Sequence, residues 1–252
     1  MIICADDFGL SSDINAAIIE LASLGKIQAA SCMTMLPQCN SSALKPLLKY
    51  APPLLVGLHL VLTDENPVTP AAQIKTLAPN GRLPSFNSLI IKNYLRKIVL
   101  SQIEAEINAQ YKMFLEKTGR NPDFIDGHLF AHQLPIIREA LIKFVKKIPS
   151  TNRPFVRSSN MHLKRILQRK TSILKNLIIS YPGRALHQRL TQEKIPTNKD
   201  FAGIYNYKYY AKFPKYFLRF VKYTDKDGGV IMVHPGSQEA FRRIEYQTLL
   251  KS

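Results

Sequence analysis

The 252-residue sequence lacks the features that mark secreted, membrane-spanning or zinc-finger proteins. It has no basic start followed by a long apolar stretch, so we expect no signal peptide, and no apolar run is long enough to span a bilayer. The three cysteines, Cys4, Cys32 and Cys39, do not have metal-finger spacing, and their odd number predicts free thiols in a reducing compartment. We therefore expect a cytoplasmic protein.

Several common catalytic motifs are also missing. The chain has no G-x-S-x-G nucleophile elbow, no P-loop and no dinucleotide-binding fingerprint. Internal repeats, low-complexity tracts and clear linkers are absent too, so although the length fits one domain or two small ones, we expect a single domain over residues 1–252. The hydrophobic content of 46% is ordinary for a globular protein and too high for a disordered one.

Acidic side chains are scarce. The chain has 18 Asp and Glu against 35 Lys and Arg, which gives a net charge of +17. This excess favours anionic partners such as nucleic acid, an acidic or phosphorylated glycan, or an anionic membrane surface. A general enrichment of surface lysine would explain the net charge equally well. Net charge alone identifies no partner.

Short apolar runs alternate with stretches of helical periodicity. The runs are residues 2–5, 29–36, 54–62, 124–125, 155–156 and 229–233, and the helical stretches are 13–24, 42–50, 101–117, 135–147, 162–191 and 214–223. Asp13 is predicted to cap the first helix and Gly25 to end it. The alternation predicts an α/β fold with parallel strands and outer helices, best matched by a distorted TIM-like (β/α) barrel. An open doubly wound sheet is the alternative.

Polar residues of catalytic type follow the first and third apolar runs. Asp6 and Asp7 are adjacent carboxylates directly after a strand, and their mutual repulsion requires a nearby cation or a raised pKa. A helix-capping turn is the simpler interpretation of this pair alone. His59 ends another apolar strand, where an imidazole needs a hydrogen-bond partner or a metal ion, although a core histidine is the commoner case.

A denser group follows the fourth run. Asp126 and His128 are two residues apart, so an extended chain points both to one side, and His132 returns to that side if the chain then turns helical. His234 ends the last strand before Pro235-Gly236. Barrel active sites lie where strands end, so these residues are predicted to gather on one face.

One carboxylate with two imidazoles suits a divalent ion such as zinc or magnesium with open positions for water. Such an ion activates water and polarises a carbonyl group, while a second Asp and a further His can move protons, which is the equipment for amide or ester hydrolysis. A metal-dependent phosphoesterase or nuclease fits the net charge but generally uses more carboxylates. A non-catalytic binding protein on a barrel scaffold would not require this residue set.

The motifs together resemble those of the YdjC-like (ChbG-type) carbohydrate deacetylases. The similarity covers nearly the whole chain, in order, and rests on the segments Ala5–Ser11, Gly57–Thr63, Asp126–Pro135 and His234–Gly236, with weaker matches at Arg157 and Phe201–Gly203. The resemblance implies a (β/α) barrel-like fold, one bound divalent metal ion (Mg or Zn), and removal of an N-acetyl group from an N-acetylated sugar such as a chitooligosaccharide, a glycolipid or another glycan containing N-acetylglucosamine.

The resemblance also implies roles for single residues. Asp7, His59 and His128 would bind the metal, Asp6 would be the general base, and His234 would be the general acid or an oxyanion-side group. The remaining positions would line or orient the site. Asp126 and Arg157 would be catalytic-site residues, and Arg157 would hold a carboxylate in place. Three further residues would lie near the substrate: His132, Phe201 and Gly203.

The sequence departs from the family pattern at Leu129 and Phe130, which replace two histidines, and at Gly127, which replaces a serine. The basic segment 162–189 is also unusual. It is predicted to lie near the barrel mouth and steer an anionic or lipid-linked glycan, or else to pack on the barrel with its charges in water. Peripheral membrane contact and a homodimer remain open, and nucleic acid is not the expected partner.

Overall fold

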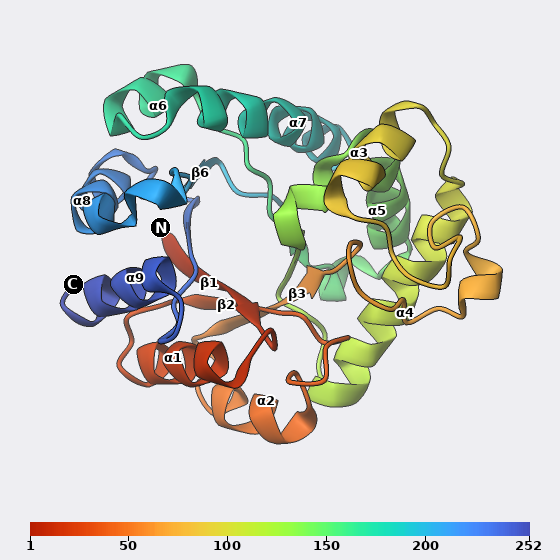
Figure 1. The fold of residues 1–252 in the computed structure, drawn as a ribbon, viewed down its shortest axis with the longest axis horizontal. Coiled ribbons are helices and arrows are strands. Elements are labelled where there is room, and N and C mark those ends of the chain that lie inside the picture. The colour runs from red at the N-terminus through yellow and green to blue at the C-terminus, as the bar shows by residue number, and fades with distance from the viewer.

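A computed structural model describes residues 1–252 and contains one parallel sheet surrounded by helices (Figure 1). The strand order is β5-β4-β3-β2-β1-β7-β6, and every neighbouring pair is parallel. The strands are β1 (Ile2–Phe8), β2 (Ala29–Cys32), β3 (Leu55–Leu60), β4 (Phe124–Gly127), β5 (Phe155–Val156), β6 (Asp200–Ala202) and β7 (Gly229–Val233).

Nine α-helices and four short 3₁₀ helices connect the strands, and the α-helices form the outer ring of Figure 1. The α-helices are α1 (Ser12–Ser23), α2 (Ser41–Leu48), α3 (Phe86–Tyr94), α4 (Leu100–Thr118), α5 (Pro135–Lys147), α6 (Leu163–Arg169), α7 (Ile173–Gln192), α8 (Phe213–Tyr223) and α9 (Ala240–Leu250). The 3₁₀ helices are η1 (Ala71–Gln73), η2 (His128–Gln133), η3 (Ser150–Asn152) and η4 (Tyr207–Lys212). None of the helices is long and apolar enough to cross a lipid bilayer.

The sheet curls into a distorted barrel. Its two edge strands, β5 and β6, do not form a ladder, but Val156 of β5 makes an isolated parallel bridge with Thr197, just before β6. The amide of Val156 donates to the carbonyl of Pro196, 2.9 Å away. The predicted distorted (β/α) barrel is therefore confirmed, and the open doubly wound sheet is not found.

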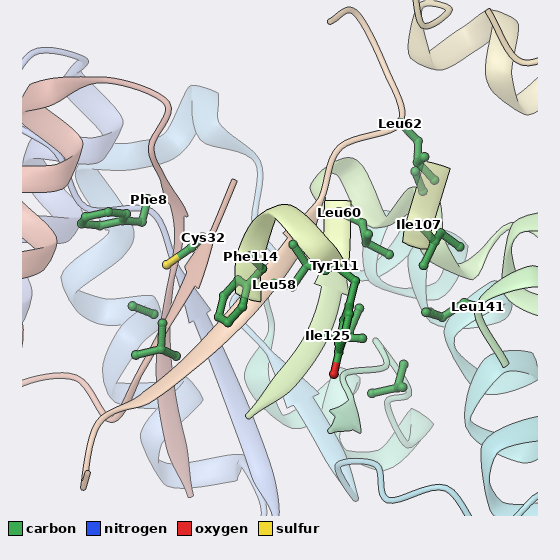
Figure 2. Close-up of a cluster of buried hydrophobic side chains, with 14 of the residues drawn as sticks. Phe8, Cys32, Leu58, Leu60, Leu62, Ile107, Tyr111, Phe114, Ile125 and Leu141 are labelled. Carbon is green, nitrogen blue, oxygen red and sulfur yellow. The ribbon is translucent and has the colours of Figure 1, made fainter. Parts of the chain in front are cut away.

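The larger core lies between the strands and the outer helices. Figure 2 shows Leu58 and Leu60 of β3 and Ile125 of β4 turned toward α4, where Ile107 and Phe114 lie about two turns apart on one face. These side chains belong to a cluster of 49 buried residues. Burial of an apolar side chain contributes about 1.5–3 kcal/mol, so this layer supplies the main force that holds the helices on the barrel.

A smaller apolar cluster fills the barrel interior, and it lies directly beneath the polar site. Successive residues of a strand point to opposite faces, so residues two apart share the interior. Three interior apolar residues are Cys4, Phe124 and Met232. The predicted site residues two positions further along are Asp6, Asp126 and His234. The strand period therefore places an apolar layer below and a polar layer above it at the carboxyl ends.

Local details differ from the sequence-based expectations. Ser11, and not Asp13, caps α1 through its side chain, while both Ser237 and Gln238 donate their backbone amides to Asp13. Gly25 follows α1 with a φ of 66°, as expected of a residue that ends a helix. The sequence patterns missed β6, which is very short, and the helices α3 and α9.

Candidate active site

The carboxyl ends of the strands surround a cavity of about 810 Å³. Five of the residues singled out from the sequence line it: Asp6, Asp7, His59, His128 and His234. They come from the ends of β1, β3, β4 and β7, which lie far apart in the sequence. The parallel arrangement of the sheet brings these ends together, as barrel active sites require.

At the end of β1 the side chains of Asp6 and Asp7 point in different directions. Asp7 has a φ of 71°, in the left-handed region that side chains other than glycine rarely adopt, and the pairing register with β2 shifts between Ala5 and Phe8. Asp6 consequently faces Arg157, whereas Asp7 faces the two histidines and Arg242. Left-handed conformations of this kind cost about 1–3 kcal/mol and are typical of functional sites.

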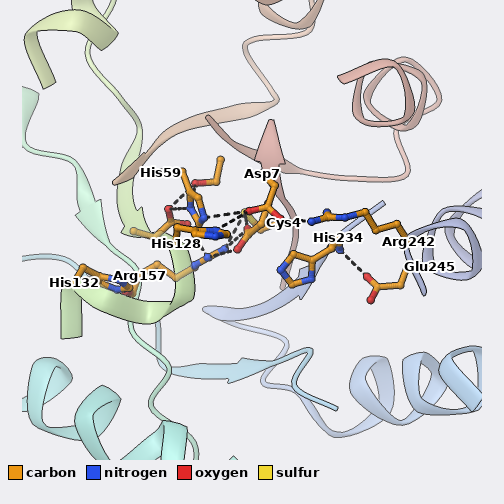
Figure 3. Close-up of polar contacts among 12 residues, drawn as sticks. Cys4, Asp7, His59, His128, His132, Arg157, His234, Arg242 and Glu245 are labelled. Atoms are coloured by element: carbon orange, nitrogen blue, oxygen red, sulfur yellow. Dashed lines mark hydrogen bonds and ion pairs between the residues drawn. The ribbon is translucent and has the colours of Figure 1, made fainter. Parts of the chain in front are cut away.

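Asp7, His59 and His128 form a compact cluster (Figure 3). The Oδ1 atom of Asp7 lies 3.5 Å from Nε2 of His59 and 3.2 Å from Nδ1 of His128. Burial disfavours ionisation of Asp7, but hydrogen bonds from His128 and His59 outweigh it and hold the pKa of the carboxyl well below its usual value. A carboxylate anion therefore faces two ring nitrogens at the mouth of the barrel.

Asp126 fixes the orientation of His59. Its Oδ1 atom lies 2.6 Å from Nδ1 of His59 and accepts a hydrogen bond of 2.5 Å from the hydroxyl of Ser31. Burial disfavours a charged His59, but the Asp126 carboxylate outweighs burial and raises the pKa of the ring to about 10. Because Nδ1 is engaged with Asp126, Nε2 is the nitrogen left to face Asp7 and the cavity.

These residues fit a divalent metal ion. One carboxylate oxygen and two imidazole nitrogens form a donor set that zinc commonly uses with open positions, and the ligand atoms lie within 4.8 Å of one another. Ligands at tetrahedral angles about 2.0–2.1 Å from an ion are about 3.3 Å apart, near the 3.2 and 3.5 Å found here. The carboxylate–imidazole contact between Asp126 and His59 is the usual outer partner of a metal-binding histidine.

A second cluster, formed by Cys4, Asp6 and Asp126, already contains a cation. The guanidinium of Arg157 donates to both oxygens of Asp6, at 2.7 and 2.6 Å, and lies 2.8 Å from Oδ2 of Asp126. Arg157 and both carboxylates are at most 2% exposed. This is the carboxylate-holding contact expected of Arg157, and a guanidinium in this position leaves no place for a second metal ion.

His234 approaches the cavity from the opposite side. Its backbone amide donates to Glu245, and its Nδ1 lies 3.2 Å from the hydroxyl of Tyr207. Burial lowers the pKa of His234 to about 4, and burial raises the pKa of Tyr207 well above its usual value. The imidazole is therefore neutral at pH 7, and Nδ1 is the ring nitrogen that contacts Tyr207.

Three residues expected near the substrate lie outside the cavity lining. His132 is buried near the end of η2, and its Nε2 lies 2.8 Å from the carbonyl oxygen of Arg157. Phe201 is buried in the barrel interior, and its ring lies 5.7 Å from the Arg157 guanidinium. Gly203 has a φ of 111°, and a Cβ atom there would lie 2.1 Å from the carbonyl oxygen of Met232. None of the three lines the cavity, and their role near the substrate stays a prediction.

Asp126 likewise lies outside the cavity lining and is fully buried, and its Oδ1 atom contacts Nδ1 of His59. The sequence analysis also missed Ser31, Tyr207, Arg242 and Glu245. Ser31 follows interior Ala29 by two residues, so the strand period could have identified it. Arg242 donates to Asp7 at 2.8 Å from α9, but no sequence pattern connects these two positions.

The cavity walls are mainly apolar. Helix α3 contributes Phe86, Ile90 and Tyr94, and the stretch from Lys175 to Pro182 of α7 lies across from it. Leu129 and Phe130 project from η2, each with a positive φ, at 53° and 58°. Part of the predicted basic segment 162–189 thus borders the cavity, but through apolar side chains of α7 more than through its charges.

Comparison with known proteins identifies a family and relatives named as carbohydrate deacetylases. The family model described as YdjC-like protein matches residues 1–252. A chitooligosaccharide deacetylase of Proteus mirabilis is 30% identical over 183 residues, which cover 73% of this chain and 66% of that protein. A carbohydrate deacetylase of Halalkalibacterium halodurans is 34% identical over 151 residues, covering 57% and 60%. The matches thus span somewhat more than half of the relatives' lengths.

A solved structure has the same fold. It is a protein of Enterococcus faecalis V583 described as a candidate cellobiose-phosphate cleavage protein, with a TM-score of 0.72 and 20% sequence identity. The superposition covers 98% of this chain and 89% of that one. At this identity the likeness concerns the arrangement of strands and helices and not the reaction.

Proposed function

The chain belongs to the family of YdjC-like proteins, and on this basis we propose that it is a metal-dependent hydrolase that removes an N-acetyl group from an N-acetylated amino sugar. The observation that carries the proposal is the convergence of Asp7, His59 and His128 beside Asp6 and His234 in one cavity. The names of the related carbohydrate and chitooligosaccharide deacetylases support the substrate class.

Each polar residue at the cavity floor can be assigned a role in amide hydrolysis. Asp7, His59 and His128 would hold the divalent ion, which lowers the pKa of water and polarises the acetyl carbonyl when bound. Asp6 is the general base: it is a carboxylate at the floor, next to the ligand Asp7 but turned away from the histidines. The bidentate contact with Arg157 keeps the Asp6 side chain in one orientation.

His234 acts on the carbonyl oxygen or the departing amine. The low pKa of its buried ring, about 4, makes it neutral at pH 7. With Nδ1 accepting from Tyr207, the N–H at Nε2 can donate to the oxyanion that develops on the acetyl oxygen. Of the two roles expected for His234, the oxyanion-side donor agrees better with this environment than an imidazolium acid does.

The phosphoesterase alternative has less support from the geometry. Two-metal phosphoesterases hold paired ions about 3.5–4 Å apart with several carboxylates. Here the neighbouring carboxylates of Asp6 and Asp126 are both bound to Arg157. The site therefore offers one metal position next to a fixed guanidinium.

The decisive experiment is mass spectrometry of a panel of N-acetylated sugars after incubation with the purified protein and added zinc or magnesium. We expect loss of one acetyl group and release of acetate, stopped by a chelator and restored by metal. The His128→Ala variant is the matched negative control. Failure to deacetylate any sugar of the panel, with phosphate-ester cleavage in parallel assays, would overturn the proposal.

A further inference from the structure

Over its first half, helix α7 turns polar and small side chains toward the barrel and apolar side chains toward solvent. The side chains turned toward the barrel include Asn176, Ser180 and Gly183, which are polar or small. The opposite side carries an apolar stripe at helical spacing, with exposed fractions of 72% for Leu174, 63% for Ile178 and 78% for Tyr181. A surface helix normally buries its apolar face, so this stripe lacks the partner that such a face requires.

Hydrogen bonds prevent α7 from rolling its apolar stripe inward. The side-chain amide of Asn176 donates to the carbonyls of Thr171 and Ile204. The hydroxyl of Ser180 accepts from the amide of Met161 and donates to its carbonyl, at 3.1 and 3.2 Å. Rotating the helix would break buried polar contacts that each contribute about 1 kcal/mol and leave their partners unsatisfied. The outward direction of the stripe is therefore built into the fold.

Apolar side chains border the cavity mouth on its other side as well. Ile91 and Leu95, at and just after the end of α3, are 59% and 58% exposed, and Tyr94 is 55% exposed. Leu129 of η2, 44% exposed, lies between the two helices in the cavity lining. We call Leu174, Ile178, Tyr181, Ile91, Leu95 and Leu129 the apolar rim. Contiguous exposed apolar surface of this kind marks an interaction site.

The segments that carry the rim contain no carboxylate. No Asp or Glu occurs in residues 86–100, 160–192 or 206–223. The same segments are rich in lysine and arginine, and several of these form no ion pair: Lys92, Arg96, Lys97, Lys170, Arg184 and Lys208. The surface thus combines exposed apolar groups with unopposed positive charge.

We propose that the apolar rim docks the cavity mouth onto an anionic lipid bilayer. Apolar side chains enter the boundary between headgroups and acyl chains, while nearby Lys and Arg attract anionic headgroups. A second copy of this chain fits the rim less well, because pairing the same face would set cations against cations in a protein of net charge +17. Docking in this orientation turns the cavity, with Asp7 and His234 at its floor, toward the lipid surface.

The proposal goes beyond the hydrolytic function and is tested without any substrate. The full chain is co-sedimented with vesicles of equimolar phosphatidylglycerol and phosphatidylcholine, and with vesicles of phosphatidylcholine alone. We expect binding to the anionic vesicles that weakens as salt is added. The rim variant Ile91→Ser/Leu95→Ser/Leu174→Ser should lose at least about tenfold in partition coefficient, because it removes three inserting side chains that do not line the cavity.

Two further variants separate docking from misfolding. Leu24→Ser changes a leucine that is 54% exposed after α1, at the opposite end of the barrel, and should bind vesicles like the unmodified protein. Lys92→Gln/Arg96→Gln/Lys97→Gln should weaken binding about fivefold per charge. No preference for anionic vesicles, or equal binding by the rim variant, would overturn the proposal. So would a dimer that the rim variant dissociates in the absence of vesicle binding.

Discussion

Two clusters of potential metal ligands lie side by side at the strand ends, and they have opposite electrostatic character. Cys4, Asp6 and Asp126 surround the guanidinium of Arg157, which offsets part of the charge of the two carboxylates from within the protein. Asp7, His59 and His128 present ring nitrogens and a carboxylate oxygen toward a cavity, and the other oxygen of Asp7 contacts the guanidinium of Arg242. Similar ligand spacing therefore yields a structural ion pair in one cluster and a candidate metal site in the other.

The difference shows why ligand type and spacing alone do not identify a metal site. A buried carboxylate needs a compensating charge, and either a side chain or a metal ion can provide it. Asp126 belongs to the first cluster by its contact with Arg157 and supports the second by its contact with His59. Asp126 therefore contacts both the cation of the first cluster and a candidate metal ligand of the second. The predictions below separate the two clusters experimentally.

The largest effect is expected at a proposed ligand of the metal, His128. His128→Ala should abolish tight zinc binding, because two protein ligands rarely hold zinc well, and the loss should exceed the ~10–100-fold typical of an outer partner. Isothermal titration calorimetry with zinc measures it. His162→Ala removes an exposed histidine at the start of α6 and should leave zinc affinity unchanged. Tight zinc binding by His128→Ala would move the metal site elsewhere.

The two adjacent aspartates should respond differently to the same change. Asp6→Asn should keep metal binding but lower kcat by ~10²–10⁴-fold with little change in KM, because a general base acts in the transition state. Asp7→Asn should lose the metal itself. Metal content and steady-state kinetics of both variants provide the test. If Asp6→Asn stripped the metal while Asp7→Asn retained it, the two roles would have to be exchanged.

Removal of the buried Arg157 guanidinium should lower the free energy of unfolding. Arg157→Met leaves the buried carboxylates of Asp6 and Asp126 without their partner, and breaking a buried pair in this way costs about 3–5 kcal/mol. Urea unfolding of the metal-free protein measures the change. Arg189→Met, which breaks a partly exposed pair with Glu139, should cost no more than about 1 kcal/mol. Equal losses in the two variants would contradict a special role for Arg157.

Asp126→Asn should weaken metal binding by ~10–100-fold, since it removes the carboxylate that orients His59. The variant retains a carbonyl oxygen that can accept from Nδ1 of His59, so the metal should still bind. Zinc titration against a chromogenic competitor gives the affinity. An unchanged affinity would mean that Ser31 and the barrel packing suffice to hold the ring in place.

A pH dependence of metal affinity is also expected. The pKa of His59 is raised to about 10 in the metal-free protein, so at neutral pH a metal ion must displace a proton from this ring. Apparent zinc affinity should therefore rise about tenfold per pH unit from pH 6 to pH 8, with a proton released for each ion bound. Calorimetry in buffers of different ionisation enthalpy counts that proton. An affinity that is flat over this range would show that His59 is already neutral.

Much of the site could be predicted because strand periodicity is local. The apolar runs ending at Asp6, His59, Asp126 and His234 showed which strand ends carry polar groups, and parallel topology then required these ends to meet. His132, Phe201 and Gly203 were expected near the substrate, but none of them lies in the cavity lining. Sequence proximity to a motif does not show whether a side chain faces the cavity or the layer beneath it.

The sequence by itself determined the α/β barrel, the strand ends that carry chemistry, and the family to which the chain belongs. Only the tertiary structure decided which charges meet. Arg242 reaches Asp7 across 235 positions of sequence, and Arg157 reaches Asp6 across 151. The tertiary structure also left the apolar stripe of α7 facing outward, because hydrogen bonds of Asn176 and Ser180 fix the helix by its polar side. Periodicity specifies that a helix has two faces, but the contacts around it decide which face is buried.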